Sequence, residues 1–242
     1  MSADLKLHPI GAGVEIYTSN IHKFGTDALL LADFAAPSVK DVACDLGTGC
    51  GIIPLLWCRS SAKPKAITAV DIQPDAIDLL KRSLAHNGIS NLAALCCDLR
   101  STPSQLHGRF TLVTMNPPYK RVEGGLISPV EGRAIARHEV TCTVEDMAQC
   151  AAKLLKPSGR LCVCHRPERL SDLMCAMRQF GIEPKRLQLV CQREGAAPML
   201  VLCEGVRGGK SGLTILPTLT VEDQLGGYSP KMKEIYSFME SL

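Results

Sequence analysis

The chain has 242 residues, enough to bury a complete hydrophobic core without disulfides or metals. Its composition is 46% apolar and 21% charged, a globular balance that excludes a largely disordered or collagen-like chain. The net charge of +3 does not establish a nucleic-acid partner, but it is compatible with one if the positive charge is local.

The chain is rich in cysteine, with twelve residues, and poor in aromatic residues, which make up 4%. Disulfide-dense domains are usually short and secreted, whereas this sequence begins MSADLK, without a signal-peptide pattern. No C-x-x-C pair or long apolar run predicts a metal site or a membrane span. We therefore expect a reduced, cytoplasmic protein, favoured as a monomer, in which most cysteines pack as small hydrophobes in apolar runs: Cys44, Cys96, Cys162, Cys164, Cys191 and Cys203.

In chain order, the first elements are a turn at Gly11-Ala12-Gly13 and an apolar helix from Thr26 to about Ala35. Short apolar runs then alternate with helical patterns. The runs predict strands at 42–46, 66–72, 93–97, 112–115 and 160–165, and helices at 52–58, 74–87, 144–155 and 168–180. The third of these helices is expected to close at Pro157-x-Gly159. This alternation predicts βαβ units and a parallel sheet covered on both faces.

The last two apolar runs, near 187–191 and 199–203, are separated by too few residues for a crossover helix, so they should pair antiparallel. A final helix is expected near 231–239. We predict one α/β domain with a doubly wound, Rossmann-like sheet, mostly parallel with a C-terminal antiparallel hairpin. It would comprise an N-terminal extension (1–40), a core (41–206) and a C-terminal extension (207–242).

A glycine-rich segment, Asp45-Leu46-Gly47-Thr48-Gly49-Cys50-Gly51, joins the first core strand to its helix. Its G-x-G-x-G spacing differs from the dinucleotide-binding G-x-G-x-x-G and carries no phosphate-binding lysine. Asp71 and Asp98 end the next two strands, at the edge where such sheets bind ligands. The acids favour a ligand with an ammonium or sulfonium group, with Asp71 on a ribose and Asp98 near an adenine. Plain turns and helix caps remain the alternative.

Asn116-Pro117-Pro118-Tyr119 follows the fourth strand. This motif suits methylation of an exocyclic amine, whose lone pair is delocalised into the ring. The Asn116 oxygen and the rigid Pro117 carbonyl could accept the amine hydrogens and favour a pyramidal nitrogen, and Tyr119 could stack on the planar acceptor. Positioning would supply most of the rate without a strong general base. A rigid turn is the alternative.

The glycine loop with its three acids resembles the S-adenosylmethionine-dependent class I methyltransferases. Asn116–Tyr119 resembles the acceptor signature of amino-group methyltransferases, which act on adenine N6, cytosine N4, guanine N2 or a glutamine amide. The resemblance implies catalytic roles for Asn116, Pro117 and Tyr119. It implies S-adenosyl-L-methionine binding, with S-adenosyl-L-homocysteine as product, by Thr26, Asp45, Gly47, Gly49, Gly51, Asp71, Ile72, Asp98, Leu99 and Asn116.

The wider pattern includes the segments at 24–31, 134–139, 204–210 and 227–230. With the two motifs, it looks like the bacterial family that methylates N6 of an anticodon-loop adenine in a valine tRNA. The resemblance implies a tRNA partner and an N-terminal extension packing on the cofactor side. In this family the segment at 25–28 helps to close the cofactor pocket, which suggests Thr26 as a contact; Thr26 as an N-cap is equally compatible.

Other activities stay open. They are glutamine-N5 methylation of a protein, guanine-N2 or cytosine-N4 methylation of a nucleic acid, and a non-catalytic RNA-binding scaffold. Glutamine methyltransferases of release factors carry an N-terminal helical domain, for which about forty residues leave no room, and many guanine-N2 enzymes carry a duplicated domain.

Two segments, 120–138 and 185–210, have an excess of basic residues, and loops there could flank Asn116. We predict phosphate contacts in them, with ordinary solvated surface as the alternative. His138, between Arg137 and Glu139, is expected to be structural rather than catalytic. The RNA-contact candidates are Lys120, Arg121, Arg133, Arg137, Arg193, Arg207 and Lys210.

Overall fold

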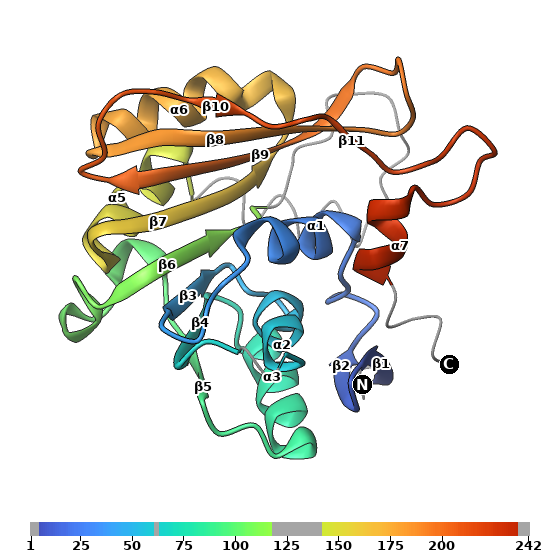
Figure 1. The fold of residues 1–242 in the computed structure, drawn as a ribbon. Coiled ribbons are helices and arrows are strands. Elements are labelled where there is room, and N and C mark those ends of the chain that lie inside the picture. The colour runs from blue at the N-terminus through green and yellow to red at the C-terminus, as the bar shows by residue number, and fades with distance from the viewer. Residues whose placement is uncertain (1–4, 61–62, 118–141, 237–242) are drawn as a thin grey trace.

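The structure is a computed structural model that describes residues 5–60, 63–117 and 142–236 (Figure 1). A mixed sheet of nine strands forms its centre, in the order β10-β8-β9-β7-β6-β3-β4-β5, with β11 also pairing with β8. The strands are β3 (Val42–Leu46), β4 (Ala66–Asp71), β5 (Leu92–Cys96), β6 (Phe110–Met115), β7 (Leu155–His165), β8 (Ile182–Cys191), β9 (Pro198–Arg207), β10 (Thr214–Ile215) and β11 (Leu219–Thr220).

The five strands from β5 to β7 are parallel, and the chain winds outward from β3 in both directions. The order therefore reverses between β3 and β6, which pair with Leu46 beside Met115. Loops leaving these two strands diverge, and this divergence creates the crevice where doubly wound sheets bind ligands. The predicted fold class is confirmed, including the antiparallel hairpin: β9 pairs antiparallel with both β8 and β7.

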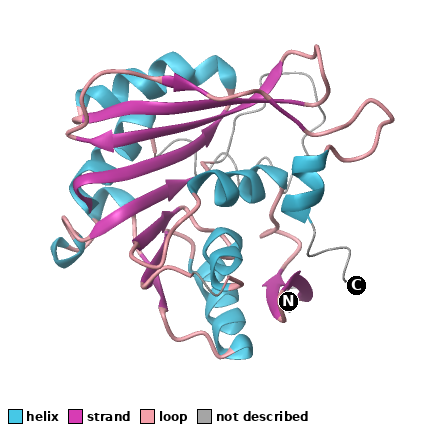
Figure 2. Cartoon of the chain, viewed as in Figure 1, coloured by secondary structure: helices cyan, strands magenta, loops and turns pink. Residues whose placement is uncertain are grey.

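Helices cover both faces of the sheet (Figure 2). One core cluster joins the sheet to α1 (Thr26–Ala35), α2 (Ile52–Cys58) and α3 (Pro74–Asn87), and the other joins it to α5 (Val144–Leu154) and α6 (Leu170–Gln179). Neighbouring strand residues serve opposite clusters, as with Ala43 and Cys44. Seven of the twelve cysteines are buried, five of those predicted to pack among them; Cys96, at the end of β5, is exposed. No helix of the described residues is long and apolar enough to cross a membrane.

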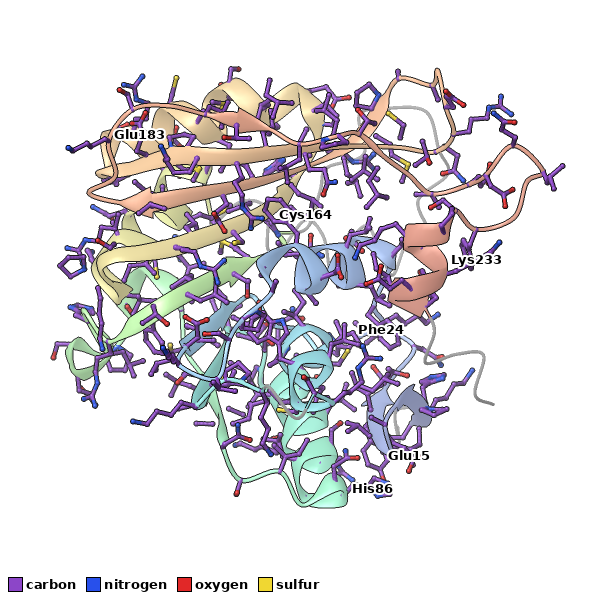
Figure 3. The ribbon with its side chains drawn as sticks, viewed as in Figure 1. Glu15, Phe24, His86, Cys164, Glu183 and Lys233 are labelled. Carbon is purple, nitrogen blue, oxygen red and sulfur yellow. The ribbon has the colours of Figure 1, made fainter. Side chains whose placement is uncertain are left out.

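The first described residues form a hairpin of β1 (Lys6–Gly11) and β2 (Val14–Thr18) around the expected glycine turn. Side chains of α3 hold this hairpin through hydrogen bonds to the backbone of β2. Asn87 accepts from Glu15 N at 2.8 Å and donates to Glu15 O at 2.6 Å, while Ser83 accepts from Tyr17 N at 2.9 Å. His86 and Glu15 also pair at 2.7 Å (Figure 3). The hairpin thus packs on the face that carries α1, α2 and α3.

The helix predicted at 144–155 is confirmed as α5, which ends at Leu154, just before Pro157-x-Gly159. The strand predicted at 160–165 is longer than expected, because β7 already begins at Leu155. Ser158 has φ +63°, and the register against β6 shifts here, so a bulge absorbs the turn residues within the strand. Glycine suits position 159, because a β-carbon there would lie only 3.0–3.1 Å from the carbonyl oxygens of Lys156 and Phe110.

The tail after β9 turns at the amino edge of the sheet and returns along β8. Both β10 and β11 run parallel to β8. The last described element of the tail is α7 (Pro230–Tyr236), which lies beside α1 (Figure 1). Lys231 of α7 pairs with Asp33 of α1 at 3.1 Å. The described part of the tail therefore reaches the carboxyl edge of the sheet, next to the start of α1.

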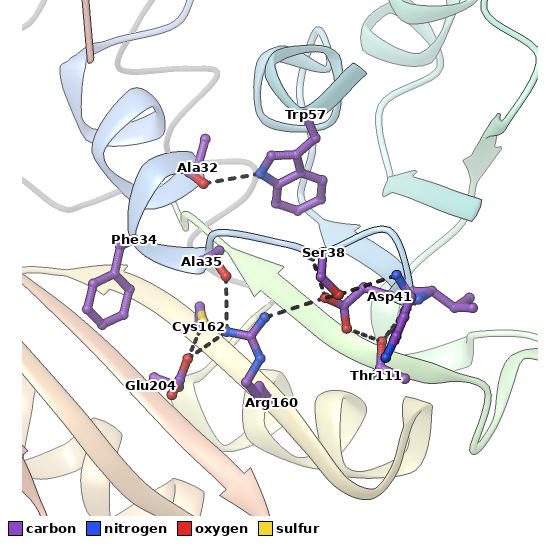
Figure 4. A network of polar contacts seen from close by, with 12 residues as sticks. Ala32, Phe34, Ala35, Ser38, Asp41, Trp57, Thr111, Arg160, Cys162 and Glu204 are labelled. Atoms are coloured by element: carbon purple, nitrogen blue, oxygen red, sulfur yellow. Dashed lines mark hydrogen bonds and ion pairs between the residues drawn. The ribbon is translucent and has the colours of Figure 1, made fainter. Parts of the chain in front are cut away.

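A buried carboxylate ties three strands to the end of α1. Glu204 of β9 pairs with Arg160 of β7 at 2.9 Å and with Arg186 of β8 at 2.8 Å. Arg160 also donates to the carbonyl of Ala35 at 3.0 Å (Figure 4). Arg186 donates to the carbonyl of Phe34 at 3.1 Å. Both carbonyls belong to the last turn of α1, where backbone carbonyls have no hydrogen-bond partner within the helix. The network thus fixes the C-terminus of α1 on the sheet.

Candidate active site

The glycine loop occupies the turn between β3 and α2. Gly47 N and Thr48 N donate to Val70 O at 2.8 and 3.0 Å, which binds the loop to β4. Gly47, Gly49 and Gly51 have φ of +67°, +56° and +89°, a region that favours glycine. A β-carbon at Gly47 or Gly49 would meet no atom of the described residues within 4 Å. The loop therefore has open space in front of it, which fits close approach by a ligand.

Gly51 has a second requirement, because a β-carbon there would lie 2.4 Å from Leu80 Cδ1 of α3. We expect Gly51→Ala to destabilise the protein by about 3 kcal/mol through backbone strain and this clash. Gly88→Ala is the matched control, since Gly88 has φ +62° but nothing within 4 Å of its β-carbon position; it should cost about 1 kcal/mol. Chemical denaturation measures both, and equal losses would contradict the role of Leu80.

Asp45 is buried at the base of this loop with an unfilled acceptor. Its Oδ1 accepts from Thr114 at 2.6 Å, but Oδ2 and the neighbouring Thr48 Oγ1 are buried without a hydrogen-bond partner among the described residues. Burial raises the pKa of Asp45 to about 7; the hydroxyls of Thr114 and Thr48, which face the carboxylate, oppose the rise, and the nearby charge of Asp71 adds to it. Because an unpaired buried acceptor is costly, this end of the loop fits a ligand that donates hydrogen bonds.

Asp71 connects the loop to the end of β4. Its two oxygens accept from Gly49 N at 2.8 Å and from Gln73 N at 2.9 Å. A carboxylate has about four acceptor positions, so each oxygen can take one further donor, such as a ribose hydroxyl. Ile72, the next residue, is 45% exposed at the same edge. An exposed apolar side chain beside a carboxylate fits the predicted placement of a nucleoside.

Asp98 already has a charged partner, Arg100. It lies two residues beyond β5 and caps a short 3-10 turn (Leu99–Ser101), accepting from Arg100 N at 2.9 Å. The Arg100 guanidinium also binds both carboxylate oxygens and lowers the pKa of Asp98. Contact between Asp98 and an adenine would therefore have to share the carboxylate with Arg100, which the sequence did not reveal.

Asn116 and Pro117 follow β6 at the point where the strand order reverses. The pairing of Leu46 with Met115 places them next to the glycine loop. Asn116 Nδ2 donates to Asp27 Oδ2 of α1 at 2.9 Å. Pro118 and Tyr119 lie outside the described residues. The first half of the acceptor motif and the cofactor candidates Asp45 and Asp71 thus share one edge of the sheet.

Thr26 is the first residue of α1, and the N-cap is Gly25, so the interpretation of Thr26 as an N-cap is wrong. Its hydroxyl instead pairs with the Tyr236 hydroxyl of α7 at 2.7 Å. Tyr236 stacks on Tyr228 with ring centroids 4.9 Å apart. The start of α1 is therefore joined to the C-terminal segment, beside the residue that contacts Asn116.

The predicted RNA contacts fall in three places. Lys120, Arg121, Arg133 and Arg137 lie outside the described residues, as does His138. Arg193 lies between β8 and β9 at the carboxyl edge. The expectation that Arg207 and Lys210 flank Asn116 is wrong. β9 runs antiparallel to β7, so it ends at the amino edge of the sheet, opposite the edge that carries Asn116, and there Arg207 donates to Leu155 O. Arg186, which also lies in the basic segment 185–210, is paired with Glu204.

Sequence reasoning missed two groups at this edge. Asp27 lies in the segment 24–31 that carries the family resemblance and is not among the predicted site residues, although a carboxylate in the first turn of a helix is favoured by the helix dipole. His165 ends β7, the strand next to β6, and Arg166 and Arg169 follow it. Burial and the charges of Arg169 and Arg166 lower the pKa of His165. A basic cluster beginning at the end of a strand adjacent to Asn116 could have been found from the strand order alone.

The strand order, the glycine loop after β3 and the antiparallel strand β9 between β7 and β8 define a class I methyltransferase. Residues 15–180 match the model of the methyltransferase small domain, and the chain belongs to this family. The resemblance inferred from the motifs is thereby confirmed at the level of the family, and the protein is an enzyme that transfers methyl groups.

Curated relatives extend the match along the chain. A tRNA1(Val) (adenine(37)-N6)-methyltransferase of Porphyromonas gingivalis is 29% identical over 220 residues, covering 86% of this chain and 85% of the relative. One of Aeromonas salmonicida is 26% identical, covering 74% of this chain and 75% of the relative.

Solved structures share the fold. A predicted O-methyltransferase from Agrobacterium tumefaciens has a TM-score of 0.69 at 19% identity, covering 88% of this chain and 96% of its own. M. jannaschii TYW2 in complex with AdoMet has a TM-score of 0.56 at 13% identity, covering 85% of this chain and 86% of its own. At this identity the likeness concerns the fold alone.

Proposed function

We propose that the protein transfers a methyl group from S-adenosylmethionine to the exocyclic N6 amine of an adenine in tRNA. The observation that carries the proposal is the position of Asn116-Pro117, at the end of β6 and next to the glycine loop of β3. The names of the curated relatives support the substrate. By the same likeness, the target is an unpaired adenine of the anticodon loop, which is less costly to flip out than a base in a duplex.

The residues of the crevice fit this cofactor. The open space before Gly47 and Gly49 admits a ligand close to the backbone. The unfilled acceptor of Asp45 fits the ammonium of the methionine part, the remaining acceptor positions of Asp71 fit the ribose, and exposed Ile72 fits the adenine ring. S-adenosylmethionine supplies an electrophilic methyl group on a sulfonium.

The residues of this chain bind and orient the acceptor amine. The Asn116 Oδ1 and the Pro117 carbonyl accept its two hydrogens, which draws the nitrogen lone pair out of conjugation with the ring. The proline ring stiffens the carbonyl it carries. Tyr119 holds the base by stacking. After transfer the nitrogen carries an acidic proton that solvent can remove, so rate enhancement comes mainly from positioning.

We expect cofactor binding to depend on pH, because Asp45 changes its ionisation near neutral pH. Its pKa of about 7 means that it is neutral below pH 7 and ionised above it. Because the ionised form attracts the cationic groups of S-adenosylmethionine, affinity should rise as pH rises through 7, on the order of fivefold from about pH 6 to about pH 8. Calorimetric titration measures this rise. Asp45→Asn should flatten it, whereas an identical pH profile in the variant would contradict the prediction.

The substrate is tested by incubating the protein with radiolabelled S-adenosylmethionine and either bulk tRNA from cells lacking this enzyme or a mixture of cellular proteins. Nucleoside analysis of the labelled product should find N6-methyladenosine in tRNA. Label in protein glutamine, guanine N2 or cytosine N4 would overturn the proposed substrate. Absence of any transfer, with RNA binding retained, would favour a non-catalytic scaffold.

A further inference from the structure

Asp27 and Asn116 are 89 positions apart in sequence and meet at 2.9 Å. Asp27 lies in the first turn of α1, where the helix dipole favours a negative charge. Its carboxylate is accommodated by Gly25: a β-carbon at Gly25 would lie 2.6 Å from Asp27 Oδ1. The N-cap glycine and the helix terminus therefore favour an anion at this point.

The hydrogen bond between Asp27 and Asn116 determines which end of the Asn116 amide faces Asp27. An ionised carboxylate only accepts hydrogen bonds, whereas an asparagine amide has a donor end and an acceptor end of nearly equal size. The Nδ2 group must therefore face Asp27, and Oδ1 must point to the other side. A hydrogen bond from Nδ2 to an anion also polarises the amide and makes Oδ1 a stronger acceptor.

Both ends of α1 are fixed. Its C-terminal carbonyls bind Arg160 and Arg186 of the Glu204 network. At its N-terminus, Thr26 pairs with Tyr236. Asp27 is thus presented to Asn116 by a helix with little freedom to shift, as a positioning group requires.

We propose that Asp27 is the positioning residue of the methyl acceptor site: it holds the Asn116 amide with Oδ1 turned toward the amine. The proposal rests on the proposed function and deepens it. Asp27 does not touch the base and takes no proton. It determines which end of the Asn116 amide meets the substrate.

The first experiment compares Asp27→Ala and Asp27→Asn with the wild type. Asn at 27 can pair with either end of the Asn116 amide, so it fills the space without specifying orientation. We expect kcat to fall about 10- to 100-fold in both variants, with KM for tRNA and the Kd of S-adenosylhomocysteine within about twofold. Asp33→Asn is the control on the same helix, where Asp33 pairs with Lys231; it should keep wild-type kcat. Wild-type kcat in both Asp27 variants would overturn the proposal.

The second experiment needs no activity. Asn116→Asp places a second carboxylate against Asp27, so the melting temperature should fall by on the order of 5 °C near pH 8. The deficit should shrink toward pH 5, because one carboxyl then binds a proton. Adding Asp27→Asn to this variant restores an amide–carboxylate pair and should recover the wild-type melting temperature.

Failure of that recovery would overturn the Asp27–Asn116 contact and with it the proposal. If the wild type transfers no methyl group to tRNA, the proposed substrate fails, while the melting experiment still decides the contact. The same kcat comparison is then made on whichever substrate the labelling experiment identifies.

Discussion

Asn116→Ala is expected to reduce kcat by about 100-fold or more, the largest effect on activity of any single change described above. The Asn116 side chain lies at the end of β6 beside the glycine loop, and its amide is oriented by Asp27. Alanine removes the acceptor that draws the amine lone pair toward the methyl group. Single-turnover assays with saturating S-adenosylmethionine measure the loss directly.

The control for loss of an asparagine side chain is Asn91→Ala. Asn91 donates to Pro64 O at 3.1 Å, away from the strand edge that carries the site. It should leave kcat unchanged. Because Asn116 borders the predicted cofactor pocket, its alanine variant should bind S-adenosylhomocysteine within a few-fold of the wild type. Methyl transfer at the wild-type rate would contradict the acceptor role of Asn116, and a lost melting transition would show that the variant fails to fold.

Glu204→Ala is expected to cause a large loss of stability, similar in size to that of Gly51→Ala. It would leave the Arg160 and Arg186 guanidiniums side by side without their shared carboxylate. Breaking a buried ion pair by removing one partner costs about 3–5 kcal/mol. The arginine side chains are 25% and 35% exposed, so solvent screens part of the repulsion, and we expect about 3 kcal/mol. Calorimetry should show the melting temperature about 6–12 °C lower.

Glu204 also predicts how stability depends on pH. Burial would raise the pKa of Glu204, but hydrogen bonds and charges from Arg186 and Arg160 outweigh burial and hold it below 4.5. A carboxyl whose folded pKa is depressed stabilises the protein above its unfolded pKa and loses this contribution as pH falls through the folded value. The melting difference between wild type and Glu204→Ala should therefore narrow below about pH 4.5.

Glu183→Ala is the matched control on the neighbouring strand. Glu183 pairs with Arg178 at 3.1 Å, and the Arg178 side chain is 65% exposed (Figure 3). Exposed pairs contribute little, so the change should be within about 0.5 kcal/mol. Equal losses in the two variants would contradict the special role of the Glu204 network in holding α1.

Several parts of the fold could be predicted because local sequence and final environment agree. Val42–Leu46 is an apolar run bounded by turn residues, and it forms β3 with those bounds. The few residues between β8 and β9 leave only an antiparallel pairing. Leu155–Gly159 differs: Pro157 and Ser158 read locally as a helix stop, but pairing with β6 at Leu155 and again at Arg160 keeps the chain in strand β7 on both sides of the bulge that contains them. Tertiary pairing outweighed local preference there.

Some residues of the site could likewise be placed from the sequence, and others could not. Asp45, Asp71 and Asn116 could be chosen because each follows or ends a predicted strand, and parallel strands bring such positions to one edge. Arg207 and Lys210 could not be placed, because their edge depends on the reversed direction of β9. Asp98 was selected for its carboxylate, but Arg100, two residues away, already binds that carboxylate.

The composition and motif spacing by themselves determined the class of fold, the glycine loop and the acceptor motif, since periodicity and strand-end chemistry are local properties. They also indicated why the net charge is small: acids at the cofactor edge partly offset basic segments. Only the tertiary structure decided which charges are paired. It joined Asp27 to Asn116, Glu204 to Arg160 and Arg186, and the C-terminal tail to the start of α1. Such contacts link residues distant in the chain, and no local pattern encodes them.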